Sequence, residues 1–224
     1  MATDPLAALV AESDEDRRWD ALRDFVSRDP SSAREVGERG LASDDVRTRQ
    51  VAADLLGSVA SIDRSMAPAV TNALLPRLGR ESEVAVLDAL IVSLGHAGDP
   101  RSRSAVLAHA EHPDENIRLS VASSLPLLGL DADALAALRR LSADPDEDVR
   151  DWATFGLAGS DADDSETMAA LAARTDDAHD DTRAEGILGL ARRKDPRARG
   201  LIEREMARPE YGTLIEQALE ELEA

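Results

Sequence analysis

The segment DPDEDVRDWATFGLA, residues 144–158, decides the fold, because most of the chain consists of variants of it. An Asp-Pro pair that ends one helix is followed by an acidic turn, and Arg150 lies at the start of the next helix. Small or apolar residues follow three, four and seven places later, at Ala153, Thr154 and Leu157. This spacing lies along one face of an α-helix. The segment therefore predicts a junction between two helices, the second of which is amphipathic.

The pattern occurs six times when the arginine is taken as position zero and later positions are counted from it as +1, +2 and so on. The position-zero residues are Arg18, Arg49, Leu87, Arg118, Arg150 and Arg183, at spacings of 31, 38, 31, 32 and 33 residues. A period in the thirties is typical of a solenoid of helix pairs. We therefore predict an all-α, right-handed α-solenoid of about seven antiparallel pairs, forming a single domain over residues 1–224. The pairs are expected at roughly residues 5–28, 31–60, 63–97, 100–129, 131–159, 163–194 and 196–224.

The repeated arginines have two interpretations. Five of the six copies carry an acid four residues earlier, so each arginine and its acid could form a catalytic pair. Catalysis needs one such site and not six, which favours a structural ladder of Arg18, Arg49, Arg118, Arg150 and Arg183. In that ladder each arginine reaches an aspartate or a carbonyl group of the adjoining repeat. The acids are also well placed to cap helix N-termini.

The run Asp-Val-Arg-x-x-Ala-x-x-x-Leu, with the sequence LGHAGDPR at residues 94–101 as its fullest tail, resembles the prokaryotic HEAT-repeat family. The short-repeat branch of that family is also known from phycobilin-lyase-like sequences. The resemblance covers nearly the whole chain and implies an armadillo-type fold whose second helices line a concave surface. It implies protein binding first, nucleic-acid binding second and catalysis rarely. Fold resemblance alone does not choose among these functions.

The charge composition is strongly acidic, with a net charge of −19. Aspartate outnumbers glutamate, 27 to 18, and Lys194 is the only lysine among 26 basic residues. This balance resembles proteins of salt-accumulating halophiles, although a GC-rich genome would also favour arginine over lysine. Acidity that is an adaptation to salt says little about the partner, because molar salt screens such charges.

Several kinds of chemistry find no support in the sequence. The absence of cysteine excludes disulfides and thiolate sites. No glycine-rich phosphate loop or nucleophile elbow occurs. His109 and His112 have a spacing that could place two metal ligands on one helix face, but Pro113 ends that helix and no third ligand is evident. We expect no catalytic residue, no metal and no cofactor, and a cytoplasmic protein without a membrane span.

Aromatic residues are scarce, so Trp152 and Phe155 are informative. Their positions, +2 and +5, lie beside the core positions +3, +4 and +7. Packing against the next repeat is slightly favoured for them, and exposure on the concave surface is the alternative. The residues expected to border the concave surface and bind a partner are Leu119, Ser120, Ser123, Asp151, Trp152, Phe155, Glu185 and Leu188.

Residues 192–208 form a basic island of net charge +4 in this acidic chain. Its basic residues are Arg192, Arg193, Lys194, Arg197, Arg199, Arg204 and Arg208. A solvated surface is the default interpretation, and docking of an acidic partner or a phosphate backbone is the alternative.

From these patterns we expect a non-enzymatic scaffold or adaptor that binds a protein or peptide on its concave surface, as a monomer. A nucleic-acid-associated protein that uses the basic island is the alternative, disfavoured by the net charge. A lyase-like, chromophore-handling protein is third and is implied only by the resemblance. Salt-dependent retention on DNA would distinguish the second possibility, and a bound pigment the third.

If the acidity is an adaptation to salt, the unfolding temperature should climb steeply from dilute buffer to molar KCl, because salt screens the repulsion among the carboxylates. Thermal unfolding followed by circular dichroism across a KCl series measures this. A flat profile over the whole range would contradict the halophilic interpretation.

Overall fold

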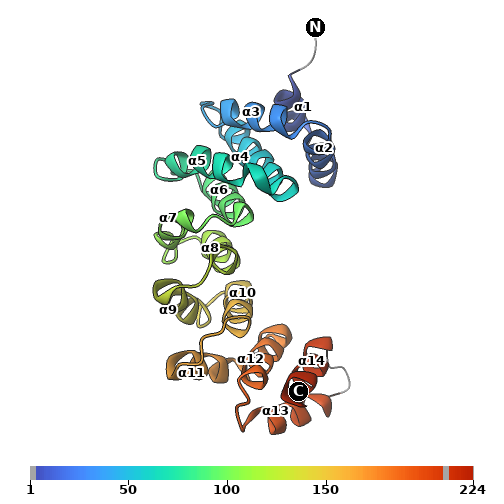
Figure 1. The fold of residues 1–224 in the computed structure, drawn as a ribbon, viewed down its shortest axis with the longest axis vertical. Helices are drawn as coiled ribbons and strands as arrows, with labels where there is room; N and C mark the ends of the chain where they lie inside the picture. Colours follow the sequence, from blue (N-terminus) through green and yellow to red (C-terminus); the bar gives the residue numbers. More distant parts are fainter. Residues whose placement is uncertain (1–3, 209–211, 224) are drawn as a thin grey trace. The chain divides into compact units, whose positions relative to one another are not determined.

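The computed structural model describes residues 4–208 and 212–223, and the regular elements in these two ranges are all helical (Figure 1). The α-helices are α1 (Pro5–Ala11), α2 (Glu15–Arg28), α3 (Pro30–Gly40), α4 (Val46–Ile62), α5 (Ala67–Leu78), α6 (Val84–Ala97), α7 (Arg103–Leu107), α8 (Glu115–Leu128), α9 (Ala132–Leu141), α10 (Glu147–Ala158), α11 (Ser165–Arg174), α12 (Asp180–Arg192), α13 (Ala198–Met206) and α14 (Thr213–Glu223). Short 3-10 turns, Arg64–Met66 and Pro100–Ser102, precede α5 and α7. Within the described residues, no helix is long and apolar enough to cross a membrane.

The helices form two compact units, one ending at Gly129 and the other beginning at Leu130. Unit 1 holds four pairs, α1/α2 to α7/α8, and unit 2 holds three, α9/α10 to α13/α14. In each pair we call the earlier helix the first helix and the later one the second helix. In unit 1, α3 and α5 lie in one layer and α4, α6 and α8 in the other (Figure 1). Each unit therefore has the layered helix-pair arrangement of an α-solenoid, as the sequence period predicts.

The second helices begin where the repeated acids cap them. The side chains of Asp14, Asp45, Asp114 and Asp146 each accept a hydrogen bond from a backbone N–H of the first turn. At α12 the imidazole of His179 takes this place, since its Nδ1 lies 3.4 Å from the N–H of Thr182. At α6, Glu83 makes no such side-chain bond. The acid four residues before position zero thus serves the backbone of its own helix.

Positions +3, +4 and +7 of the second helices form the core. In α4 these are Ala52, Ala53 and Leu56, all fully buried. In α10 they are Ala153, Thr154 and Leu157, and the hydroxyl of Thr154 donates to the carbonyl of Arg150 at 2.7 Å. A buried hydroxyl therefore keeps a hydrogen-bond partner. The predominance of alanine and leucine gives a core made of small and medium side chains.

Three pairs of consecutive second helices, α4 and α6, α6 and α8, and α10 and α12, approach each other very closely at a repeated pair of positions. The residue at +6 of one helix lies against the residue at +8 of the helix before it. Ser93 of α6 lies against Gly57 of α4, and a Cβ atom on this glycine would be 2.5 Å from the serine Oγ. Ser124 of α8 lies in the same way against Gly95 of α6, at 2.6 Å. The two helices of each contact therefore leave no room for a side chain on the glycine.

The serines at +6 also bond to the helix they touch. Ser93 Oγ donates to the carbonyl of Ala53 at 2.8 Å, and Ser124 Oγ donates to the carbonyl of Ile91 at 3.3 Å. Both carbonyl groups lie at position +4, one turn before the glycine. In unit 2 the glycine is at +6 instead of +8, because Gly189 of α12 lies against Ala158 at +8 of α10. A Cβ atom added to Gly189 would be 3.1 Å from the Cα atom of Ala158. The same close register is thus kept with a different pair of small residues.

This contact predicts opposite effects for two glycine-to-alanine substitutions. Gly95→Ala should destabilise the protein by about 1–3 kcal/mol, because overpacking outweighs the gain in helix propensity. Gly200→Ala is the matched control, since a Cβ atom there meets nothing within 4 Å and α13 should gain roughly 0.5–1 kcal/mol. Urea unfolding followed by circular dichroism measures both. Equal stability of Gly95→Ala and the parent would contradict the close register.

Candidate protein-binding surface

Trp152 and Phe155 form an exposed aromatic pair on α10. Their exposed fractions are 43% and 48%, and their ring centroids lie 5.7 Å apart at an interplanar angle of 75°. Such an edge-to-face pair is a favoured aromatic geometry. The two residues between them, Ala153 and Thr154, are fully buried. Positions +2 and +5 therefore lie beside the buried face of the helix, where solvent can reach them. The aromatic pair is therefore available to a partner.

Two acids accompany the aromatic pair in unit 2. Asp151 accepts a hydrogen bond from Thr182 Oγ1 at 3.1 Å and lies 3.8 Å from Nδ1 of His179. Burial raises the pKa of Asp151. Glu185 of α12 is only 7% exposed, and burial, followed by the negative charge of Asp151, raises its pKa to about 7. We call Asp151, Trp152, Phe155 and Glu185 the α10–α12 surface.

Leu188, also expected at this surface, is 2% exposed and belongs to the core of unit 2. Its helix α12 packs against α10 on one side and α14 on the other, so even its +5 position is covered. The expectation that Leu188 contacts a partner is corrected by this burial.

The remaining predicted partner-binding residues lie on α8 in unit 1. Ser120 is buried, and its hydroxyl lies within hydrogen-bond distance of two acceptors, the carboxylate of Asp88 and the carbonyl of Asn116, the latter at 2.8 Å. Leu119 and Ser123 are half-buried, and Ser123 Oγ donates to the carbonyl of Ser120 at 3.2 Å. Ser120 therefore has an internal role instead of the predicted contact with a partner.

Unit 1 carries two further acids on its second helices, which the sequence analysis did not single out. Burial raises the pKa of Asp54 on α4 to about 7, and burial also raises the pKa of Asp88 on α6. Asp88 lies at +1, as Asp151 does, and Asp54 lies at +5. Both residues could have been found in the sequence by searching for an acid at +1 or +5, the positions beside the core.

The repeated arginines hold the turn between the two helices of their own pair. Nη1 of Arg49 donates to the carbonyls of Ser43 and Asp44, and Nη1 of Arg150 donates to those of Asp144 and Pro145, at 2.9–3.1 Å. Arg118 and Arg183 make the same two bonds, to the residues six and five places before them. Two carbonyl groups of the turn thus accept hydrogen bonds from a charged donor.

The same guanidinium groups reach a carboxylate in the next pair. Arg49 bonds to Glu81 with its Nε at 2.9 Å, and Arg150 bonds to Asp177 with its Nε at 3.0 Å. Arg183 Nε lies 3.5 Å from a Glu205 oxygen. Burial alone would raise the pKa of Glu81, but hydrogen bonds from Arg49, Arg77 and two backbone N–H groups outweigh it and lower the pKa to about 2. The arginines therefore tie successive repeats together.

Arg18 differs from the other repeated arginines. It is buried, its Nη2 lies 3.5 Å from Glu15, and its Nε has no hydrogen-bond partner within the described residues. The carboxylate partners Glu81 and Asp177 were not predicted from the sequence, where the acid four residues before position zero is the one that recurs. They lie six residues before position zero of the following second helix, and this spacing is the signal that identifies them.

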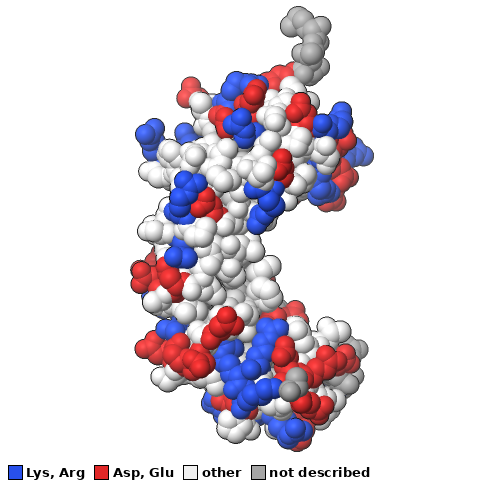
Figure 2. Space-filling view, viewed as in Figure 1, with Lys and Arg blue, Asp and Glu red and all other residues white. Residues whose placement is uncertain are grey.

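Most of the basic island is engaged within unit 2. Arg193 donates to backbone carbonyls that include those of Leu157, Ser160 and Ala162, and Lys194 donates to the carbonyl of Glu221. The island also forms ion pairs, which include Arg192–Glu221, Arg197–Asp195, Arg204–Asp176, Arg204–Glu205 and Arg208–Glu205. Figure 2 shows blue side chains of unit 2 lying among red ones. Arg199 is exposed and makes no hydrogen bond or ion pair within the described ranges.

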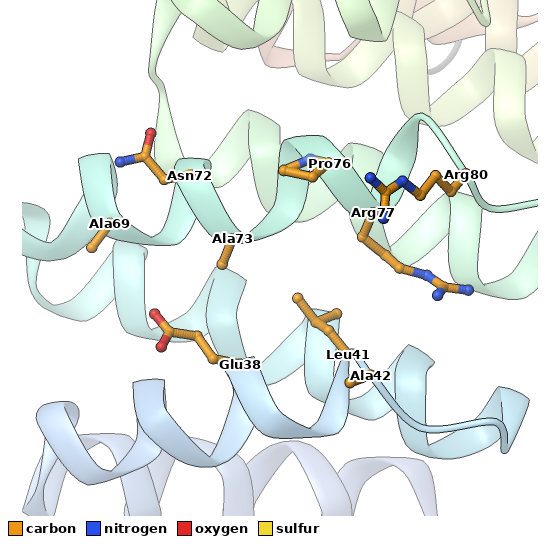
Figure 3. Close-up of a pocket in the computed structure, with 9 residues that line it drawn as sticks. All are labelled: Glu38, Leu41, Ala42, Ala69, Asn72, Ala73, Pro76, Arg77 and Arg80. Atoms are coloured by element: carbon orange, nitrogen blue, oxygen red, sulfur yellow. The ribbon is translucent and has the colours of Figure 1, made fainter.

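Unit 1 also contains a pair of histidines and a hollow between two of its first helices. His109 and His112 have ring centroids 6.4 Å apart, and the described residues contain no group of three or more His, Cys, Asp or Glu side chains that could hold a metal. A hollow of about 550 Å³ lies between α3 and α5 (Figure 3). Of its polar residues, Glu38, Asn72 and Arg77 are already bonded to Arg34, Arg101 and Glu81, whereas the side chain of Arg80 makes no hydrogen bond or ion pair within the described residues. The hollow therefore offers few free polar groups.

Comparisons with known proteins agree with this architecture. Residues 71–158 match the family model described as HEAT repeats. No curated protein matches the sequence. Among solved structures, the YibA protein of Escherichia coli is similar, with a TM-score of 0.80 and 22% identity over 100% of this chain and 82% of that one.

Two further solved structures resemble the chain. The archaeal HEAT-like repeats protein from Thermococcus onnurineus gives a TM-score of 0.63 at 15% identity, over 100% of this chain and 97% of that one. A designed armadillo repeat protein in complex with the peptide (KR)4 gives 0.63 at 16%, over 86% and 100%. Residues 71–158 thus match HEAT repeats, and the solved neighbours share the all-helical solenoid fold of the chain.

The arginine ladder predicts a structural effect of Arg150→Ala. Removing this guanidinium takes the donor from two carbonyls and one of the donors from the Asp177 carboxylate, so the protein should lose about 1–3 kcal/mol of stability. Arg199→Ala in the same unit removes an equal charge and should change stability by less than about 0.5 kcal/mol. Calorimetric unfolding of the two variants measures the difference. Equal melting of both would contradict the structural role.

Proposed function

We propose that the protein is a non-enzymatic scaffold or adaptor that binds a protein segment on the second helices of unit 2. The observation that carries the proposal is the exposed pair Trp152 and Phe155. Rigid aromatic side chains commonly supply most of the binding energy of an interface. In a chain with only 2% aromatic residues, two adjacent exposed rings are unusual. The acids that pair with the ladder arginines hold successive repeats together. This structural role supports a non-enzymatic function.

The fold is compatible with this role. Solenoids of stacked repeats present extended surfaces that suit peptides and partner helices. The designed armadillo repeat protein among the structural neighbours is itself in complex with a peptide. This neighbour supports peptide binding as a use of the fold. The residues proposed to bind a peptide in the present protein are those of the α10–α12 surface.

Nucleic-acid binding through residues 192–208 is the second candidate. Exposed Arg199 and the solvent-facing parts of the paired arginines favour it. Against it, ion pairs within unit 2 already neutralise much of the island, and the net charge of −19 repels a phosphate backbone. We therefore place protein binding first. A chromophore-handling role rests on the family resemblance alone.

The cellular setting is part of the same proposal. We infer a monomeric protein that works in the cytoplasm of a salt-accumulating cell. The excess of aspartate and the near absence of lysine support the salt-rich setting.

The proposal predicts that Trp152→Ala weakens binding at least tenfold, since a central aromatic anchor contributes about 2 kcal/mol or more. Peptides selected from a random displayed library on the parent protein provide the ligands, and their affinities for the parent and the variant are compared. Met206→Ala on α13, with 38% exposure in the same unit, is the matched control and should bind like the parent. Failure to select any peptide, or unchanged affinity for Trp152→Ala, would contradict the proposed function.

A further inference from the structure

Glu185 is a buried acid without a partner. Its exposed fraction is 7%, and its carboxylate makes no hydrogen bond or ion pair within the described residues. A buried carboxylate normally has a cation or N–H donors to offset the loss of hydration. The other buried acids of unit 2 obey this rule, because Glu205 pairs with Arg208 and Asp195 with Arg197. The oxygens of Glu185 are not among the fully buried unpaired atoms, so its carboxylate reaches the surface, where a partner can contact it.

The charges around Glu185 do not supply a paired cation. Asp151 from α10 and Asp181 from α12 repel its negative charge, and Arg192, the basic residue that attracts it, is shared with Glu221 of α14 at 3.3 Å. From the other neighbouring helices, Arg174 of α11 pairs with Asp177, and Glu205 of α13 lies near Arg183. The α10–α12 surface thus keeps an excess of negative charge at one point.

The register between α10 and α12 places the aromatic pair beside this charge. Thr182 bonds to Asp151, and Gly189 lies against Ala158, so each residue of α12 lies level with a residue 31 places earlier. Glu185 is then level with the turn of α10 between Asp151 and Phe155. Trp152 lies on the same turn. Two carboxylates and two aromatic rings are therefore gathered on one part of the second-helix face.

We propose that the α10–α12 surface binds an arginine or lysine side chain of the partner segment, with its cationic group at the carboxylates of Glu185 and Asp151 and its stem against Phe155 and Trp152. This inference rests on the proposed function and names the chemistry of the partner, a cationic peptide. Carboxylates form charge-assisted hydrogen bonds with guanidinium and ammonium groups, and aromatic rings attract cations. The net charge of −19 favours the same partner over long range.

Binding of a cation should be linked to proton release. Because the pKa of Glu185 is about 7, this carboxyl is largely protonated at pH 6 in the free protein and largely charged at pH 8. A cation binds the charged form, so affinity should rise with pH and level off above the pKa. When only the charged form binds, the affinity at pH 6 is about tenfold below its limit.

The test uses the full chain and a fluorescent octapeptide of alternating lysine and arginine, at constant ionic strength. Fluorescence anisotropy gives the affinity at pH 6 and pH 8. At pH 8, Glu185→Gln should weaken binding at least tenfold and also abolish most of the pH dependence. Glu203→Gln is the matched control, because it removes the same charge from an exposed site on α13 and should change affinity less than twofold.

Three outcomes would overturn the inference. The first is equal binding by Glu185→Gln and the parent, and the second is an equal loss in Glu185→Gln and Glu203→Gln, which would show only general attraction by an acidic protein. The third is no binding of the octapeptide to the parent. If library peptides without basic residues still require Trp152, the cation site fails while the proposed function stands. Removal of a buried, unpaired charge does not threaten folding, so loss of binding is not explained by unfolding.

Discussion

The close approach of consecutive second helices is the constraint on which the rest of each unit depends. Between α4 and α6, α6 and α8, and α10 and α12, it requires small residues where +6 of one helix meets +8 of the previous one, as in Ser93 on Gly57 and Ser124 on Gly95. Serine hydroxyls then bond across the contact to a carbonyl at +4. At this distance a single methyl group has no space, so the register of the stack is fixed. Pro126 occupies +8 of α8, the last second helix of unit 1, where the small-residue rule ends.

The fixed register decides which residues are left for function. Positions +3, +4 and +7 are buried in the pair, and +6 and +8 are used between helices. The positions that remain at the face of a second helix are +1, +2 and +5. In α10 they carry Asp151, Trp152 and Phe155, whereas in α12 the +5 residue Leu188 is covered by neighbouring helices. The aromatic pair is exposed because the packing of the stack commits the other positions of α10.

Much of this could be predicted from the sequence, because a repeated pattern reports a repeated environment. The period of the position-zero arginines indicated helix pairs, and recurrence of the arginine itself indicated structure over catalysis. The carboxylate partners Glu81 and Asp177 were not predicted, since they become neighbours of Arg49 and Arg150 only when repeats stack. For the same reason the basic island looked free in the sequence, although Arg193 and Lys194 donate to carbonyls far along the chain. The burial of Leu188 and Ser120 likewise depends on neighbouring helices that offsets within one helix do not describe. The pattern of core positions reports how helices pack. It carries no information about the salt concentration of the source cell or the identity of the partner.

The two tryptophans allow the most direct measurement of the central claim, that a cationic peptide binds at the α10–α12 surface. Trp152 lies on α10 in unit 2 and Trp19 lies on α2 in unit 1, so each indole N–H gives a separate signal in a nitrogen-15 correlation spectrum. The signals are assigned with a Trp19→Phe variant and followed while the alternating Lys/Arg octapeptide is added. We predict that the Trp152 signal moves progressively to saturation while the Trp19 signal stays in place. A peptide that binds while the Trp152 signal does not move, or that moves both signals equally, would contradict this claim.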